Sequence, residues 1–206
     1  ILASFAAVSL ILTSGCQSIH DKNEVKVEIL HTNDMHSHFA GSKNGSACIT
    51  ENDCEGGYGR VAEYVKEVKE RNPNAIFLDA GDQFQGSLLY VNYHSPLVGK
   101  ITDKMRYDFA TFGNHEFDEG CKALSDYAKK ADFPFLVANL KPSPGCPLSM
   151  NSISPFTVID GPDAKIGIIG LANPDVVNQS KACKDTKFVD HVEAVKDSVK
   201  ALQARK

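Results

Sequence analysis

The sequence predicts an α/β fold, a layered sandwich whose strands pair mainly in parallel. Short apolar runs that suit buried strands alternate with segments whose apolar residues recur every three or four positions, as on one face of a helix. The order is strand, helix, strand, helix, strand, helix, strand, which is typical of parallel strands joined by crossover helices. Two more strands and a last helix follow.

The expected elements have recognisable boundaries. The first helix stops near Asn72-Pro73, and the second opens at Ser95, an N-cap residue followed by Pro96 at the first helical position. Residues 161–164 form a turn between the last two strands, and the proline-rich segment 141–147 is a loop. Strands are expected at 25–31, 75–80, 107–112, 135–138, 156–160 and 165–170, and helices at 61–72, 95–105, 121–128 and 192–202.

The composition is that of an ordinary globular domain. The chain has 206 residues, of which 42% are apolar and 23% are charged. Its net charge of −4, without a basic stripe, argues against binding of a nucleic-acid polymer. Single nucleotides stay open as substrates, because metal ions rather than lysines can hold a phosphate.

The first residues resemble an export leader. Residues 1–12 form an apolar run that is too short to span a bilayer and suits the core of a signal peptide. Residues 12–16 resemble a bacterial lipobox, in which Cys16 would be acylated after cleavage and would attach the protein to a membrane. Plain secretion is the alternative. Residues 1–16 are therefore interpreted as a leader and 17–24 as a linker, and the protein is expected in the periplasm, on the outer membrane or outside the cell.

Export changes the interpretation of the cysteines, because disulfides persist in oxidising compartments. Cys48 and Cys54 lie six positions apart in a polar segment, and we expect them to close a small loop. A second disulfide, Cys146–Cys183, is a further hypothesis. Connectivity cannot be read from sequence alone, so the pairing of Cys121 stays open.

Polar residues with metal-binding side chains follow three of the expected strands. Asp34 and His36 come after the first, Asp82 after the second and Asn114 after the third. The carboxyl ends of parallel strands meet at one edge of a sheet, where open α/β sheets place their reactive groups. Asp34 and His36 are two apart on an extended segment, so their side chains project the same way and can share one metal.

Phosphate ester hydrolysis explains this set of residues. Two metal ions can acidify a water nucleophile and clamp the attacking and leaving oxygens. Asp82 follows Gly81 at a sharp turn and has two oxygens with which to bridge two cations, while Asn114 offers a carbonyl oxygen to the second ion. His115 can point toward the phosphate, and Asp118, three positions on, can hold its imidazole in one tautomer.

The motifs resemble those of a known family. The segments 31–38 (HTNDMHSH), 79–86 (DAGDQFQG) and 113–118 (GNHEFD) are similar to the calcineurin-like metallophosphoesterases, and within them to the secreted 5′-nucleotidases. The likeness runs from about residue 25 to about residue 170. It implies a four-layer α-β-β-α sandwich and hydrolysis of small nucleotides to nucleoside and phosphate by a water molecule that two divalent ions activate.

The resemblance also assigns roles to residues. Asp34 and His36 would bind one metal, Asp82 would bridge, and Asn114 would bind the other. Asn114 and His115 would contact the substrate phosphate. His115 with Asp118 would form the dyad that stabilises the phosphoryl group during its transfer. The mixed oxygen and imidazole set suits Zn, Mn or Fe, with Mg and Ca as alternatives. The Cys48–Cys54 loop is similar to a small disulfide loop of the animal enzymes.

The sequence departs from the family pattern after residue 170. The family completes its metal shell with later Gly-His and Gly-His-x-His motifs, whereas the sole histidine after His115 is His191, in a different context. The family's C-terminal domain, which holds the nucleoside, has no counterpart. The resemblance thus implies that residues 25–206 are the N-terminal metallophosphoesterase domain, truncated at its C-terminus.

Other functions stay open. Within the same family the alternatives are a nucleoside diphosphate-sugar hydrolase, an apyrase and a 2′,3′-cyclic phosphodiesterase/3′-nucleotidase. A non-catalytic surface or binding protein is the alternative from another class, because the later histidines are missing.

Overall fold

The fold is known from a computed structural model that describes residues 25–44, 46–48, 54–142, 146–148, 152–176 and 186–205. The expected leader, linker and lipidation site Cys16 lie outside these residues. Cys183 lies outside them as well.

The central sheet is parallel, as the sequence predicted. Five strands pair in the order β1-β4-β5-β6-β8, and every neighbouring pair runs in parallel. The strands are β1 (Ile29–Thr32), β4 (Ile76–Asp79), β5 (Phe109–Ala110), β6 (Phe135–Leu136) and β8 (Ile153–Ser154). The crossovers between the first four are α1 (Tyr58–Arg71), α2 (Leu88–Met105) and α3 (Gly120–Lys130).

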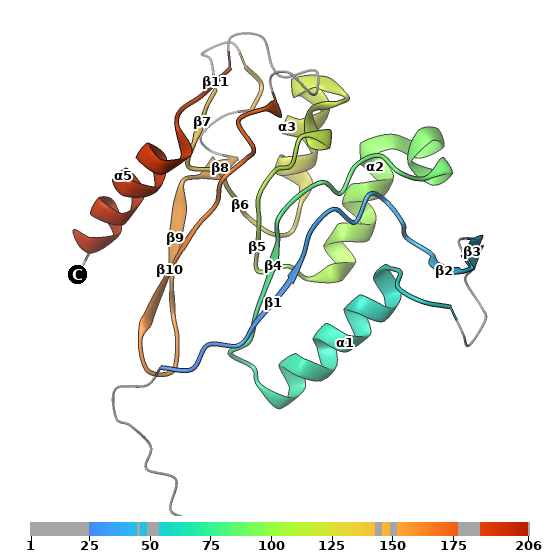
Figure 1. The fold of residues 1–206 in the computed structure, drawn as a ribbon, viewed down its shortest axis with the longest axis horizontal. Helices are drawn as coiled ribbons and strands as arrows, with labels where there is room; N and C mark the ends of the chain where they lie inside the picture. The colour runs from blue at the N-terminus through green and yellow to red at the C-terminus, as the bar shows by residue number, and fades with distance from the viewer. Residues whose placement is uncertain are drawn as a thin grey trace, which may run out of the picture.

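The remaining elements build the other layers. Figure 1 shows α1, α2 and α3 on one side of the sheet, and the hairpin of β9 (Phe156–Asp160) and β10 (Lys165–Ile169) with α5 (His191–Gln203) on the other. The hairpin is antiparallel across the expected turn. Gly167 of β10 allows close packing of α5, because a Cβ there would lie 2.9 Å from Cδ1 of Leu202. The layers therefore follow the order helix, sheet, hairpin and helix.

Two small antiparallel pairs complete the fold. β7 (Leu140–Lys141) pairs with β11 (Lys187–Phe188), and β2 (Gly41–Lys43) pairs with β3 (Ser46–Cys48). The core between sheet and helices is aromatic. Its fully buried phenylalanines are Phe77, Phe84, Phe112, Phe117 and Phe135.

α2 begins earlier than the sequence predicted. It starts at Leu88 and breaks at His94, whose φ of 54° and ψ of −162° are not helical. The segment that follows begins at the expected Ser95, whose N–H and hydroxyl both donate to the Glu119 carboxylate at 2.9 Å. The pattern missed the first segment because its apolar residues point outward: Leu88 is 81% exposed and Val91 61%.

One of the two proposed disulfides is present and the other is wrong. Cys48 and Cys54 are bonded to each other. Cys146 carries a free thiol. Cys121, whose pairing the sequence left open, is disulfide-bonded. Cys146 packs against the aromatic core, where a thiol behaves as a small apolar side chain.

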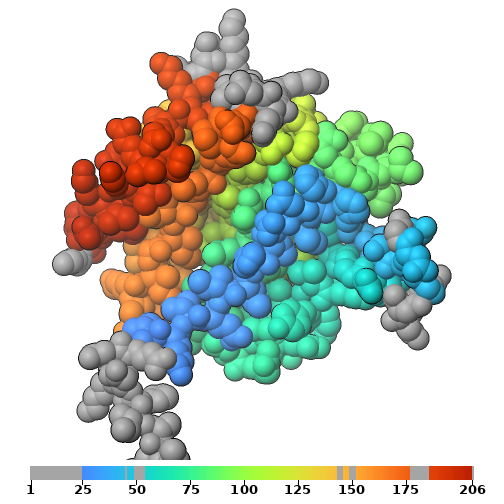
Figure 2. Space-filling view, in the orientation of Figure 1, coloured from blue at the N-terminus to red at the C-terminus, as the bar shows by residue number. Residues whose placement is uncertain are grey.

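Apolar side chains are exposed at the β1 edge of the sheet. Figure 2 shows the segment that leads into and through β1, in blue, lying open beside α1. Val25, Val27 and Ile29 on this edge are 44%, 39% and 52% exposed. Within the described residues no helix is both long and apolar enough to cross a membrane.

Candidate metal centre

Three loops meet at the carboxyl edge of the sheet. They follow β1, β4 and β5, which are neighbours in the sheet, so the loop after β4 lies between the other two. Backbone hydrogen bonds extend the β1–β4 pairing into the loops. Asp34 N–H donates to Gly81 O at 2.9 Å and His36 N–H donates to Asp82 O at 3.0 Å. The first two loops therefore form one continuous ribbon.

Three of the four predicted metal ligands have unusual backbone conformations. Asp34, His36 and Asp82 have φ values of 51°, 46° and 59°, in the left-handed region that non-glycine residues rarely occupy. Such strain persists where surrounding contacts enforce it, and it concentrates at functional sites. Here the interloop hydrogen bonds enforce it.

The structure brings three of the four predicted ligands together. Ligand atoms of Asp34, His36 and Asp82 all lie within 4.8 Å of one another. Nδ1 of His36 lies 3.2 Å from the carbonyl oxygen of Phe84, and Nε2 lies 3.8 Å from Oδ1 of Asp34. A histidine that gives one ring N–H to a carbonyl presents its other nitrogen as a ligand. Two carboxylates and such an imidazole fit a divalent cation.

The fourth predicted ligand, Asn114, lies directly beside this group. It precedes the 3₁₀ helix η1 (His115–Phe117), and its neighbours Gly113 and His115 both contact Asp82. A Cβ on Gly113 would lie 2.1 Å from Oδ1 of Asp82, which explains the glycine at this position. His191 is exposed at the start of α5 and is not among the residues whose ligand atoms converge.

His115 and Asp118 are in contact, as the motif predicted. Nδ1 of His115 lies 2.7 Å from Oδ2 of Asp118. Gln85 donates its side-chain N–H to the same oxygen at 2.7 Å. Because a carboxylate only accepts hydrogen bonds, Nδ1 of His115 carries the proton and donates to Asp118. The His115 ring lies edge-on to the ring of His36, with centroids 5.3 Å apart, so the dyad adjoins the metal group.

The sequence of the chain matches a known protein family over most of its length. Residues 27–180 match the calcineurin-like phosphoesterase family. The chain belongs to this family.

Several proteins that resemble the phosphoesterase chain are named 5′-nucleotidases. It is 31% identical to 5′-nucleotidase of Homo sapiens, over 98% of this chain and 36% of that protein. It is 35% identical to snake venom 5′-nucleotidase of Naja atra, over 82% and 32%. The chain spans about a third of the length of the relatives that it matches.

Solved structures agree on the fold. A 5′-nucleotidase precursor from Thermus thermophilus superposes with a TM-score of 0.77 at 32% identity, over 87% of this chain and 35% of that one. The NAD nucleotidase of Haemophilus influenzae gives 0.77 at 28% identity, over 88% and 32%. The mixed α/β architecture with a parallel central sheet is therefore confirmed as that of the 5′-nucleotidase structures.

One residue of the phosphoesterase site was missed by sequence reasoning. The Glu116 side chain is 1% exposed, and its carboxylate accepts backbone N–H groups from Asp82, Gln83, Phe84 and Gly113. Burial raises the pKa of this carboxyl, while the N–H groups of Asp82 and Gln83 act to lower it. The one sequence feature that could have indicated Glu116 is an acidic side chain between His115 and the apolar Phe117.

A second buried carboxylate lies under the loops. Oδ1 of Asp79 accepts the Thr32 hydroxyl at 2.9 Å and the Gln83 side-chain N–H at 2.6 Å. The network continues from Gln83 to the Tyr58 hydroxyl and from Thr32 to the Tyr107 hydroxyl. Burial, followed by the charge of Glu116, raises the pKa of Asp79 well above its usual range.

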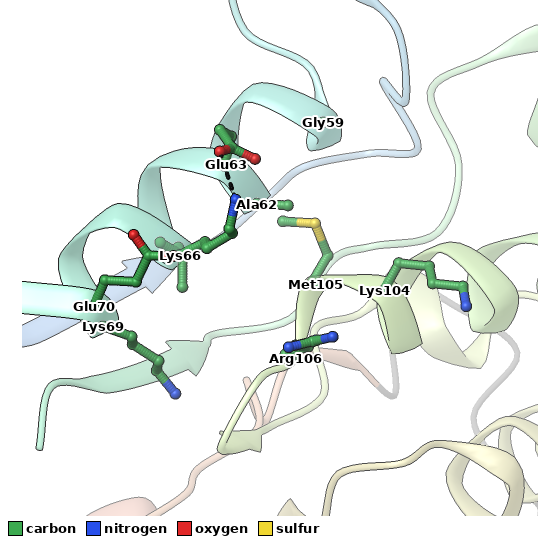
Figure 3. Close-up of a pocket in the computed structure, with 10 residues that line it drawn as sticks. Gly59, Ala62, Glu63, Lys66, Lys69, Glu70, Lys104, Met105 and Arg106 are labelled. Atoms are coloured by element: carbon green, nitrogen blue, oxygen red, sulfur yellow. Dashed lines mark hydrogen bonds and ion pairs between the residues drawn. The ribbon is translucent and has the colours of Figure 1, made fainter. Parts of the chain in front are cut away.

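Two hollows lie on the surface nearby. One, of about 510 Å³, borders the site through Ser37, His38 and Gly86 and continues to Leu88 and Leu89. The other, of about 550 Å³, lies between α1 and the C-terminal end of α2, where Lys66, Lys104 and Arg106 surround Met105 (Figure 3). Since its lining includes no residue of the three loops, it is not part of the metal centre.

Proposed function

We propose that this domain hydrolyses phosphate monoesters of nucleotides, in the manner of a 5′-nucleotidase, with two divalent metal ions. The observation that carries the proposal is the convergence of Asp34, His36 and Asp82 beside the His115–Asp118 dyad. The names of the relatives support nucleotides as the substrate class.

In this proposal each ligand has its own task. Asp34 and His36 would hold one ion, Asp82 would be shared by both ions, and Asn114 would contribute to the second. When bound, the ions acidify a water molecule and neutralise charge on the phosphate oxygens. The mixed donor set suits Zn, Mn or Fe.

The dyad acts on the substrate in this proposal. The Nδ1–H of His115 is held by Asp118, so Nε2 is the ring atom left to meet a phosphoryl oxygen or the leaving oxygen. The ring is 5.3 Å from that of His36, so it reaches the space in front of the metal group. Asp118 fixes the tautomer of the His115 ring, while Gln85 holds Asp118 in place.

The test is the metal-dependent release of phosphate from AMP by the intact protein. We expect Asp82→Asn to abolish release, because the shared ligand of both ions loses its charge. The matched control is Asp126→Asn, the same change at an exposed aspartate paired with Lys122. Release by Asp82→Asn at the rate of the control would overturn the proposal.

Substrate choice is tested with the same protein. A panel of AMP, ATP, a UDP-sugar and a 2′,3′-cyclic nucleotide separates the nucleotidase from the apyrase, sugar-hydrolase and cyclic-phosphodiesterase alternatives. We expect AMP to give the highest kcat/KM. Stoichiometric metal binding without turnover of any of these compounds would favour the non-catalytic binding protein instead.

We further propose that the protein is exported, by a lipoprotein or an ordinary leader. The Cys48–Cys54 disulfide supports an oxidising compartment. Relatives that are named for snake venom or as a precursor support the same conclusion. Fractionation of expressing cells, with labelling of Cys16 by a fatty acid, tests both forms of export.

A further inference from the structure

We propose that Glu116 is a positioning residue of the metal centre: its carboxylate joins the loop of Asp82 to the loop of His115 and thereby sets metal affinity. The inference deepens the proposed function and rests on it. Glu116 is buried, and the hydrogen bonds that it accepts from described residues come from backbone N–H groups.

One carboxylate oxygen connects the two loops. Oε2 of Glu116 accepts the Asp82 N–H at 2.9 Å and the Gly113 N–H at 2.6 Å. Asp82 belongs to the loop after β4 and Gly113 to the loop after β5. Hydrogen bonds to a charged acceptor are about twice as strong as neutral ones. This oxygen therefore fixes the separation of the loops beyond the ends of their strands.

The other oxygen organises the Asp82 loop. Oε1 of Glu116 accepts the Gln83 N–H at 2.7 Å and the Phe84 N–H at 3.3 Å. With Asp82 in the left-handed region, φ 59°, three successive N–H groups turn toward one point. Such a concave set of amides is an anion-binding nest. The carboxylate of Glu116 fills it from within the fold.

No cation shares this charge within the described part of the chain, where Glu116 forms no ion pair. The four backbone amides therefore stabilise the buried carboxylate, and the carboxylate in turn provides the hydrogen-bond acceptor for four N–H groups of the loops. A buried polar group left without its partner costs about 1–3 kcal/mol. Loss of one carboxylate oxygen would leave two of these amides without their acceptor.

The consequence reaches the proposed bridging ligand. The Asp82 backbone is held at its N–H by Glu116 and at its carbonyl by the His36 N–H, at 3.0 Å. Its Oδ1 accepts the His115 N–H at 2.9 Å. Glu116 therefore controls both the direction of the Asp82 carboxylate and the distance from Asp82 to His115.

Glu116→Gln is the informative substitution. Glutamine keeps the size of the side chain, but it replaces one oxygen with an NH₂ group. Each oxygen of Glu116 accepts two N–H groups, so in either orientation the NH₂ group would face two donors. The substitution therefore removes the hydrogen bonds to one of the two oxygens, while the side-chain volume in the core is unchanged.

The experiment titrates metal-free intact protein with Mn²⁺ and follows the free ion by EPR, with near-UV circular dichroism as the check on folding. We expect Glu116→Gln to weaken Mn²⁺ binding about 10- to 100-fold, the usual effect of removing an outer-shell partner. Thr102→Val is the control. It removes a buried hydroxyl, bonded to Val98 O at 3.0 Å in α2, and should lower stability without changing affinity.

The outcomes separate the two proposals. If Asp82→Asn abolishes Mn²⁺ binding while Glu116→Gln binds within twofold of the unmodified protein, Glu116 is not a positioning residue. If Asp82→Asn also leaves binding unchanged, the metal centre itself is misassigned. Should Glu116→Gln not fold, Glu116→Asp is measured by the same criterion, because it keeps the charge but is one methylene too short to reach all four amides.

Discussion

The backbone N–H of His115 donates a hydrogen bond of 2.9 Å to Oδ1 of Asp82. This contact joins the proposed bridging ligand to the residue proposed to meet the phosphoryl group. Oδ2 of Asp82 does not take part in this contact. The two functional residues come from different strands, yet a change at either one displaces the other.

The first prediction follows from the space between these loops. Gly113→Ala should disturb the metal centre, because the new methyl group would lie 2.1 Å from Oδ1 of Asp82 and 2.6 Å from its N atom. We expect a loss of metal affinity of at least tenfold, measured by Mn²⁺ titration. Gly59→Ala is the matched control, since open space surrounds that position in α1. Equal affinities in the two variants would contradict the close approach.

The convergence of Asp34, His36 and Asp82 was predictable for a physical reason. Apolar periodicity is a local signal, and parallel strands bring their carboxyl ends to one edge. Residues that follow such strands therefore meet, even when they are far apart in the chain. The His115–Asp118 contact was predictable because the two residues are three positions apart in one turn.

The contacts of Glu116 were not predictable in the same way. Three of its four partners are backbone N–H groups 32 to 34 positions earlier, those of Asp82, Gln83 and Phe84. A backbone donor carries no signature in the sequence. The first segment of α2 was missed because its apolar side chains face solvent. β7, β8 and β11 were missed because each of these two-residue strands contains a single apolar residue.

The second prediction concerns the dyad. Asp118→Asn should lower kcat for AMP by about 10²-fold or more, because an amide, unlike a carboxylate, does not hold the His115 ring in one tautomer. Metal affinity should stay unchanged, since Asp118 contacts His115 and Gln85 rather than the metal group. Steady-state kinetics and Mn²⁺ titration of the same preparation measure both. A loss of metal with the loss of activity would place Asp118 among the residues that build the metal centre.

The third prediction concerns Gln85, which donates to the same oxygen of Asp118 that His115 contacts. Gln85→Leu keeps similar volume and removes this donor. We expect a decrease in kcat of roughly 3- to 30-fold, smaller than for Asp118→Asn, because a hydrogen bond to a charged group contributes about 1.5–3 kcal/mol at most. In the double variant the Gln85 effect should disappear. Independent, multiplying effects would mean that Gln85 acts elsewhere.

The last prediction concerns pH and the buried carboxyl of Asp79. Burial raises the pKa of Asp79 well above its usual range, so the folded state binds this proton more tightly than the unfolded state, where the pKa is about 3.9. A group of this kind favours folding at low pH. Its contribution is lost as the pH rises from about 4 through the folded-state pKa.

Asp79→Asn removes this titration and retains an oxygen to which Thr32 and Gln83 can both donate. We therefore expect the free energy of unfolding of the unmodified, metal-free protein to fall relative to that of Asp79→Asn as the pH rises. Urea unfolding of both proteins at intervals between about pH 4.5 and 8 measures the difference. A difference that stays constant across this range would show that Asp79 has the same pKa in the folded and unfolded states.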